Sequence, residues 1–154
     1  MKKQDYTASI AVNATAQEAF NAINNVRAWW SEDLEGSTDK FNDVFTVRFG
    51  EVFITSKVVE LIPGRKIVWQ VTDCNKPWLK NKKEWVGTKI CFEISEKDNK
   101  TQIAFAHLGL VAELECFDAC ANAWSEYIGQ SLWSLLTKGK GRPTPRKTMG
   151  MAIK

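Results

Sequence analysis

His107, the single histidine of the sequence, is the residue best suited to move a proton or to orient a ligand near neutral pH. It alternates with Ile103 and Phe105, so the three side chains are expected on the same face of a strand. Two interpretations remain open. In a pocket, the ring is a polar group that positions a ligand or transfers a proton. In a packed core, its nitrogens bond to a neighbouring carbonyl or carboxylate and the residue is structural.

Two of the four cysteines, Cys116 and Cys120, are spaced one helical turn apart and would share one face of a helix. With His107 they could form a three-ligand metal site of the catalytic type. Their spacing is not that of a common zinc motif, and free cysteines are often simply buried. A nucleophilic role would need a lowered thiol pKa, for which only His107 is available. We therefore expect two packed thiols, no metal and no cofactor.

The common catalytic sequence motifs are missing from the sequence. It has no G-x-x-x-x-G-K-[ST], no G-x-G-x-x-G after a strand, no H-E-x-x-H and no G-x-S-x-G. The sequence therefore leaves open whether the protein is an enzyme.

Aromatic residues are unusually frequent, with seven Trp and eight Phe among 154 residues. Each ring carries a large apolar surface. Since a domain of this size can use only some of these rings as ordinary core, their number favours an aromatic-lined cavity or contact surface. Two further apolar residues, Trp78 and Leu79, fall in a lysine-rich connection, where they could form a lid over an entrance or simply belong to a surface loop.

The charge distribution argues against a nucleic-acid partner. Segment 138–154 holds six of the 21 basic residues and no acidic one, which leaves 15 basic against 18 acidic residues in 1–137. A nucleic-acid-binding domain would carry its positive charge on a folded face. We also expect no membrane span, because no apolar run approaches about 18 residues. The N-terminus has no signal-peptide pattern and the cysteines no C-x-x-C pair, so we expect a cytoplasmic protein with reduced thiols.

The elements that must position these residues follow from periodicity. Alternation over Thr7–Val12 predicts a strand, and the capping box that starts at Thr15 predicts a short helix, followed by a helical turn near Trp29. Between Gly36 and His107 the pattern is almost wholly that of strands joined by turns. In the strand over 52–61, Val58 and Val59 compete for the inner face.

From Glu113 to about Lys138 the period changes to 3.6, which predicts one long helix. Its apolar stripe consists of Phe117, Cys120, Trp124, Ile128, Leu132 and Leu135. An antiparallel sheet with one apolar face must be covered, and this helix is the only predicted element long enough to do so.

Several short motifs follow one another over about residues 5–138. They are 13–20 (NATAQEAF), Trp29-Trp30, 59–64 (VELIPG) with 67–69 (IVW), 85–88 (WVGT), 101–110 (TQIAFAHLGL) and 124–136 in the last helix. In the order and spacing of these motifs the sequence resembles the START-like helix-grip superfamily (SRPBCC), and within it the branch similar to the C-terminal domain of the activator of heat-shock protein 90 ATPase. It implies an internal apolar cavity between sheet and helix that holds a lipid, a steroid, a polyketide or another hydrophobic molecule.

We therefore predict an α+β helix-grip fold, with a curved antiparallel sheet of about six to seven strands around a long C-terminal helix and two short helices after the first strand. The domain is expected to span residues 1–138, and 139–154 to form a basic, flexible tail. The predicted function is binding of a small hydrophobic molecule by a monomer or homodimer. A cavity-based cyclase, dehydratase or hydrolase, or a chaperone-regulating interaction module, remains the alternative. The predicted ligand-binding residues are Trp30, Phe45, Val47, Trp69, Val71, Ile90, Phe92, Phe105, His107, Cys120, Trp124 and Ile128.

Overall fold

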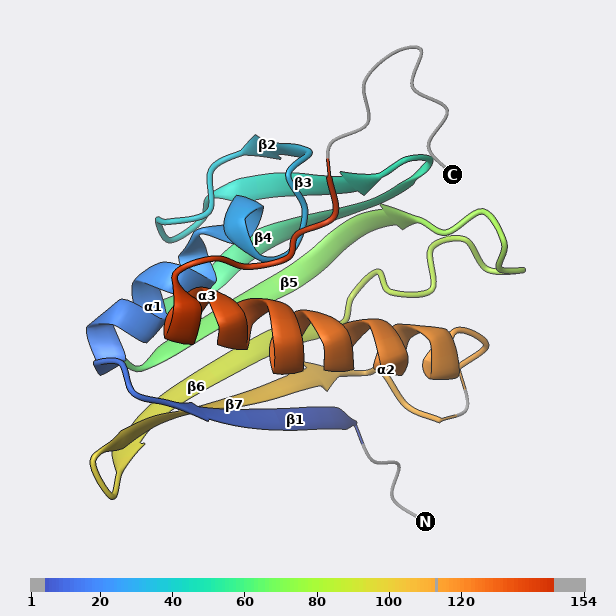
Figure 1. The fold of residues 1–154 in the computed structure, drawn as a ribbon. Coiled ribbons are helices and arrows are strands. Elements are labelled where there is room, and N and C mark those ends of the chain that lie inside the picture. The colour runs from blue at the N-terminus through green and yellow to red at the C-terminus, as the bar shows by residue number, and fades with distance from the viewer. Residues whose placement is uncertain (1–4, 113, 146–154) are drawn as a thin grey trace.

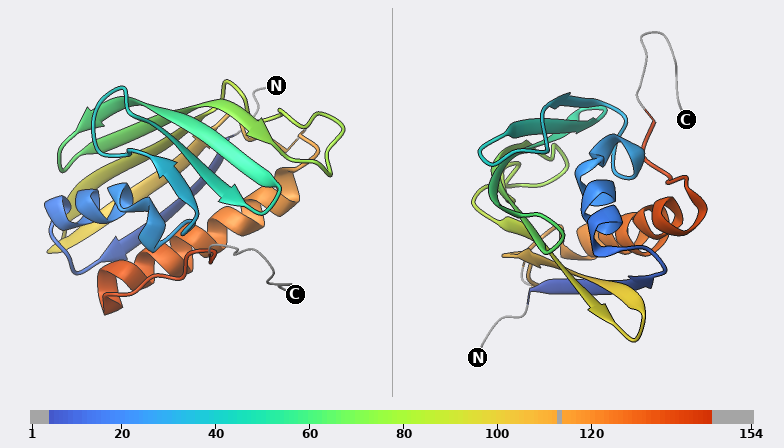
Figure 2. Two further views of the ribbon diagram at one scale, coloured as in Figure 1. Left: turned by 90° about the horizontal axis from the view of Figure 1, so that it is seen from above. Right: turned by 90° about the vertical axis from the view of Figure 1, so that its left-hand side faces the viewer.

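The computed structural model describes residues 5–112 and 114–145 of the chain. Within them, one seven-stranded antiparallel sheet with the order β1-β7-β6-β5-β4-β3-β2 curls around a long C-terminal helix (Figure 1). The curl is plain from the side, where the sheet forms an open trough around the helices (Figure 2, right). The predicted α+β helix-grip fold, including its strand number, is confirmed.

The elements follow one another in the predicted order, with one short additional strand, β2. Their bounds are β1 Tyr6–Val12, α1 Ala16–Asn24, η1 Val26–Ala28, β2 Leu34–Gly36, β3 Val44–Phe49, β4 Val52–Ile62, β5 Lys66–Asn75, β6 Lys89–Lys97, β7 Lys100–Leu108, α2 Phe117–Glu126, η2 Tyr127–Leu132 and α3 Trp133–Lys138.

Helix α1 begins where the capping box predicts. The Thr15 hydroxyl accepts from the Glu18 amide at 3.0 Å, and the Glu18 carboxylate accepts from the Thr15 amide at 2.8 Å. These two bonds satisfy backbone donors that the first turn of a helix leaves free. The cap fixes the direction of α1, and the turn η1 that follows sends the side chains of Trp29 and Trp30 into the core.

Turn chemistry and bulges set the register of the sheet. Gly64, after Pro63, has φ +72°, the positive value that the second central position of a type II turn requires. The pairing of β4 with β5 shifts register between Thr55 and Ser56 and again between Val58 and Glu60. These shifts decide which of Val58 and Val59 faces inward. Val58 faces inward and is fully buried, because the irregularity after it lets the alternation restart.

The C-terminal helix runs from residue 117 to 138 but is not α-helical throughout. It begins at Phe117 rather than at Glu113, which lies outside the described residues, and a π-helical segment, η2, separates α2 from α3. A π turn holds more residues than an α turn, so the buried face shifts. As a result Ser131 joins Leu132 on the inner side, beyond the predicted apolar stripe.

The chain after the helix packs back onto the fold as far as residue 145. The Ser131 hydroxyl accepts from the Arg142 amide at 2.7 Å, and the Thr144 amide donates to the Trp30 carbonyl at 3.0 Å. Thr144 also forms an isolated bridge with Ser31. Residues of the predicted tail thus contact the domain within 139–145, and the rest of that tail, 146–154, lies outside the described residues.

Aromatic rings fill most of the space between sheet and helix. Trp30 lies almost parallel to Trp69, with ring centroids 5.9 Å apart, and its other neighbours include Trp29 at 6.0 Å and Trp124 at 5.0 Å. Phe105 contacts Trp124 at 4.6 Å from the floor of the trough. These ring contacts join the segment after η1, the sheet and the C-terminal helix into one core.

Replacing Ser131 by alanine is expected to destabilise the protein by about 2 kcal/mol. Its hydroxyl donates to the Trp29 carbonyl at 2.7 Å and accepts from the Arg142 amide, so the change removes the partners of one buried and one partly buried backbone group. Urea unfolding measures the effect. Thr137→Ala, which removes an exposed hydroxyl bonded within the helix, is the matched control and should cost well under half as much. Equal losses in the two variants would contradict this account.

Candidate functional site

An apolar pocket of about 290 Å³ remains at the end of the trough where the β3–β4 turn, the β5–β6 connection and α2 meet. This volume lies at the lower end of the range typical of small-molecule sites. The pocket opens to solvent between these segments. Its walls consist of Trp30, Phe49, Val52, Ile54, Lys76, Trp78, Trp85, Ala119, Cys120, Ala123, Trp124, Tyr127 and Thr144.

Small side chains on α2 leave the space that the pocket occupies. Ala119 and Ala123 are four residues apart, so they lie on the same face of the helix, with Cys120 beside them. One position further, Trp124 fills its part of the interior completely. The change from a large ring to methyl groups along one helix therefore marks the boundary between solid core and pocket.

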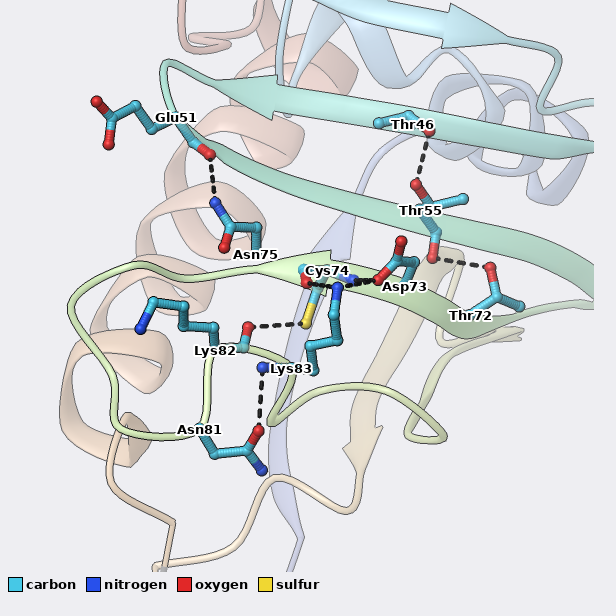
Figure 3. A network of polar contacts seen from close by, with 10 residues as sticks. All are labelled: Thr46, Glu51, Thr55, Thr72, Asp73, Cys74, Asn75, Asn81, Lys82 and Lys83. Carbon is cyan, nitrogen blue, oxygen red and sulfur yellow. Dashed lines mark hydrogen bonds and ion pairs between the residues drawn. The ribbon is translucent and has the colours of Figure 1, made fainter.

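The β5–β6 connection, residues 76–88, forms one rim of the pocket and is tied to the sheet by polar contacts (Figure 3). Lys83 donates to the Asp73 carboxylate at 2.7 Å and to the Cys74 carbonyl at 3.2 Å. The bond from Lys83 lowers the pKa of Asp73. At the end of the same strand, β5, the Asn75 side-chain amide donates to the Glu51 carbonyl at 3.0 Å, which joins this strand end to the β3–β4 turn.

The same connection also holds the start of α2. The Glu84 carboxylate accepts from the amides of Glu115 and Cys116, at 3.2 and 3.3 Å. A carboxylate at this end of a helix satisfies free amides and complements the helix dipole. In return, the Glu115 carboxylate accepts from the Lys80 amide at 3.0 Å. Rim and helix wall are therefore held together by reciprocal bonds.

His107 is fully buried near the C-terminal end of β7, and both of its ring nitrogens have hydrogen-bond partners. Trp124 donates its indole N–H to Nδ1 at 3.0 Å, so Nδ1 is the unprotonated nitrogen. Nε2 then carries the hydrogen and bonds to the Thr88 hydroxyl at 2.8 Å, and that hydroxyl donates to the Trp85 carbonyl at 2.6 Å. The arrangement fixes one neutral tautomer and favours the structural interpretation of this residue.

The surroundings of His107 oppose its protonation. Burial, and to a lesser degree the positive charge of Lys76, lower the pKa of His107 from 6.5 to about 3. A proton on Nδ1 would also have no acceptor, because that position faces the indole donor of Trp124. The ring is consequently neutral in the folded protein at physiological pH.

Cys116 and Cys120 form a hydrogen-bonded thiol pair, of which Cys120 lies in the pocket wall. The thiol of Cys116 hydrogen-bonds to Cys120, which lowers the pKa of Cys120, and the nearby charge of Lys76 acts in the same direction. That bond, together with burial and a bond with Glu84, raises the pKa of Cys116. The indole N–H of Trp85 donates to the Cys116 sulfur at 3.4 Å. Cys120 is therefore the thiol of this pair that ionises first, and it lines the pocket.

The histidine and the cysteine pair do not form a metal site. Among the described residues, no three side chains of His, Cys, Asp or Glu are grouped so that they could hold a metal ion. His107 has both ring nitrogens engaged by Trp124 and Thr88, and Cys116 is engaged by Trp85 and Cys120.

Three of the twelve residues predicted to bind ligand, Trp30, Cys120 and Trp124, line the pocket. The other nine lie in the solid core or beneath the wall: Phe45, Val47, Trp69, Val71, Ile90, Phe92, Phe105, His107 and Ile128. Of the predicted lid residues, Trp78 lines the mouth and is 55% exposed, whereas Leu79 is 3% exposed and belongs to the core.

The remaining wall residues were missed by sequence reasoning. Phe49 and Val52 lie at a turn, and Thr144 lies in the segment taken for a tail. Trp85 could have been identified from the sequence, because it is a tryptophan in a connection between strands, two residues before a glycine, and belongs to the motif 85–88. Lys76 gave none, because it is one of four lysines in the same connection.

Comparison with solved structures places this architecture among known ones. The Aha1 dimer from Colwellia psychrerythraea superposes with a TM-score of 0.74 at 23% identity, over 90% of this chain and 99% of that one. Protein SSP2350 from Staphylococcus saprophyticus gives 0.69 at 13% identity, over 92% and 98%. DynU16, a protein of the dynemicin biosynthetic locus, gives 0.68 at 16% identity, over 91% of this chain and 50% of its own.

The chain shares its helix-grip fold with these proteins. The resemblance drawn from the sequence is thus confirmed at the level of the fold, and the structures that share this fold include Aha1. No family model matches the sequence, and no curated protein matches it. Among the described residues of this helix-grip chain, no helix combines the length and apolar character needed to cross a membrane.

Acidification is expected to destabilise this helix-grip domain through His107. Because its pKa falls from 6.5 in the unfolded chain to about 3 in the fold, the stability it contributes is complete above pH 6.5. It is lost as the pH falls from 6.5 towards 3, by about 1.4 kcal/mol per pH unit. Urea unfolding between pH 7.5 and 4 should show this slope as the difference between the wild type and His107→Gln. Parallel pH profiles for the two proteins would refute it.

The thiol pair gives a second expectation. The alkylation rate of Cys120 by iodoacetamide should reach half its maximum at a lower pH than that of Cys91, whose pKa is raised by burial. Cys116→Ala should move the Cys120 midpoint upward, because the hydrogen bond from Cys116 is removed. Peptide mass spectrometry after timed labelling measures each site separately. A Cys120 midpoint that is unchanged in Cys116→Ala would contradict the assignment.

Proposed function

We propose that this protein binds a small hydrophobic molecule in the pocket between the β5–β6 connection, the β3–β4 turn and α2. The observation that carries the proposal is the pocket itself, a space of about 290 Å³ in an interior that aromatic rings otherwise fill. Four of its walls are indole rings, those of Trp30, Trp78, Trp85 and Trp124. Rigid aromatic walls with few polar groups are typical of sites for apolar ligands.

The expected affinity follows from the area that such a ligand would bury. About 200 Å² of apolar ligand surface, at about 25 cal/mol per Å², yields about 5 kcal/mol before the cost of association. Stacking against the indoles adds to this. The pocket can therefore hold a small ligand, and polar groups at its wall must provide the choice among ligands.

Two alternatives from the sequence need different evidence. A cavity-based cyclase, dehydratase or hydrolase that used His107 would require its ring to leave the bonds with Trp124 and Thr88. The similarity to Aha1 suggests a chaperone-regulating module as the second alternative. Such a module would act through exposed residues, and Trp78 at the mouth of the pocket is the aromatic ring best placed for that. The pocket supports binding of a small hydrophobic molecule more directly than it supports the enzyme or the chaperone-regulating module.

The setting proposed for this activity is the cytoplasm, with the chain acting as a monomer or homodimer and without nucleic acid. All four cysteines are free, which suits a reducing compartment.

Filling the pocket is the direct test. Ala123→Phe places a ring into the space beside Cys120, so binding of the neutral dye Nile red should weaken at least tenfold. Fluorescence titration measures this, and native mass spectrometry of protein purified from its own cells looks for a retained ligand.

Asn122→Phe is the matched control, because it adds the same ring to an exposed position of α2 outside the pocket wall. It should bind Nile red within about twofold of the wild type. The proposal fails if the wild type binds no dye, or if Ala123→Phe and Asn122→Phe bind it equally well.

A further inference from the structure

Lys76 is a buried lysine in the wall of the pocket. It directly follows β5, and its backbone is fixed on both sides: its amide donates to the Lys82 carbonyl and its carbonyl accepts from the Leu79 amide, each at 3.0 Å. The residue is 5% exposed, whereas Lys80 and Lys82 in the same connection are exposed. Lysines are almost never buried to this degree unless their charge is paired. The position is therefore one that needs an explanation.

Two indole rings hold the ammonium group. Its nitrogen lies 4.1 Å from the ring centroid of Trp85 and 5.2 Å from that of Trp78. Both rings line the pocket, as does Lys76 itself. The faces of aromatic rings attract a cation but carry no net charge, so the positive charge stays uncompensated.

No carboxylate in the described part of the chain forms an ion pair with Lys76. Glu84, in the same connection, directs its carboxylate to the amides that start α2. The lysine charge acts on the pocket interior instead, where it contributes to the lowered pKa values of Cys120 and His107. Lys76 thus faces the pocket without a carboxylate partner, and an anion bound in the pocket would supply one.

We propose that the ligand of this pocket is a hydrophobic molecule with one carboxylate, and that the carboxylate pairs with Lys76. This inference rests on the proposed function and narrows its ligand class. The single cation in the pocket wall matches the single charge of a carboxylate better than that of a phosphate ester, which carries about −1.5 to −2 at neutral pH. The apolar part of the ligand lies against Trp30 and Trp124 in the pocket wall, and the acid end lies towards the rim.

A matched pair of ligands tests the inference. We expect 2-naphthoate to displace Nile red from the wild type at about tenfold lower concentration than 2-naphthalenemethanol, which has the same rings without the charge. In Lys76→Met this preference should vanish, through a loss of at least tenfold for the acid and little change for the alcohol. Lys76→Arg, which restores the charge, should recover the preference. Lys82→Met, which removes an exposed lysine of the same connection, should behave like the wild type.

The outcomes separate the two proposals. If the wild type and Lys76→Met both bind Nile red but show the same preference between acid and alcohol, the carboxylate assignment is overturned and the hydrophobic pocket stands. If the wild type binds neither Nile red nor either naphthalene compound, the proposed function fails as well. If Lys76→Met does not fold, two other results decide the question. The carboxylate assignment is overturned if the wild type does not prefer the acid to the alcohol. It is also overturned if Lys76→Arg and Lys76→Gln show the same preference between them.

Discussion

The distance between the sheet and the C-terminal helix is set by aromatic rings, and the rest of the structure depends on this spacing. Trp29, Trp30 and Trp69 stack in the middle of the trough, and Trp124 extends the layer to the helix. Rings of this size hold α2 away from the sheet. Where the helix presents Ala119 and Ala123 instead of a ring, the same separation leaves a space that the protein does not fill. Pocket and core are thus two results of one constraint.

Much of this architecture could be predicted from the sequence because it depends on local periodicity and local caps. Alternation placed the strands, and the capping box at Thr15 and the turn at Gly64 occur where expected. The π-helical segment could not be foreseen, since nothing local to residues 127–132 distinguishes it from an α-helix that contains a glycine. The docking of 139–145 was hidden for a similar reason: its partners, such as Trp30 and Ser131, are distant in sequence.

The candidate site was predicted only in part, because alternation tells which face of a strand a side chain shares but not what covers it. Phe92 and Phe105 face inward as expected, yet other rings cover them and they belong to the core. His107 faces inward too, and its role is decided by Trp124 and Thr88, whose proximity no sequence spacing reveals. Lys76 differs from its neighbouring lysines only in being enclosed by two indoles, which again is a property of the folded chain.

The C-terminal helix is held by hydrogen bonds on two sides. On one side the Tyr6 hydroxyl of β1 bonds to Ser125, and on the other the returning chain bonds to Tyr127 and Ser131 through Thr144 and Arg142. An outward movement of the helix would break the hydrogen bonds on both sides. Moving the Trp78 ring at the open end would disturb only its contact with Lys76 among the ring contacts that the structure shows. A ligand that enters at the open end of the trough, past Trp78, therefore breaks fewer contacts than one that enters by separating the helix from the sheet.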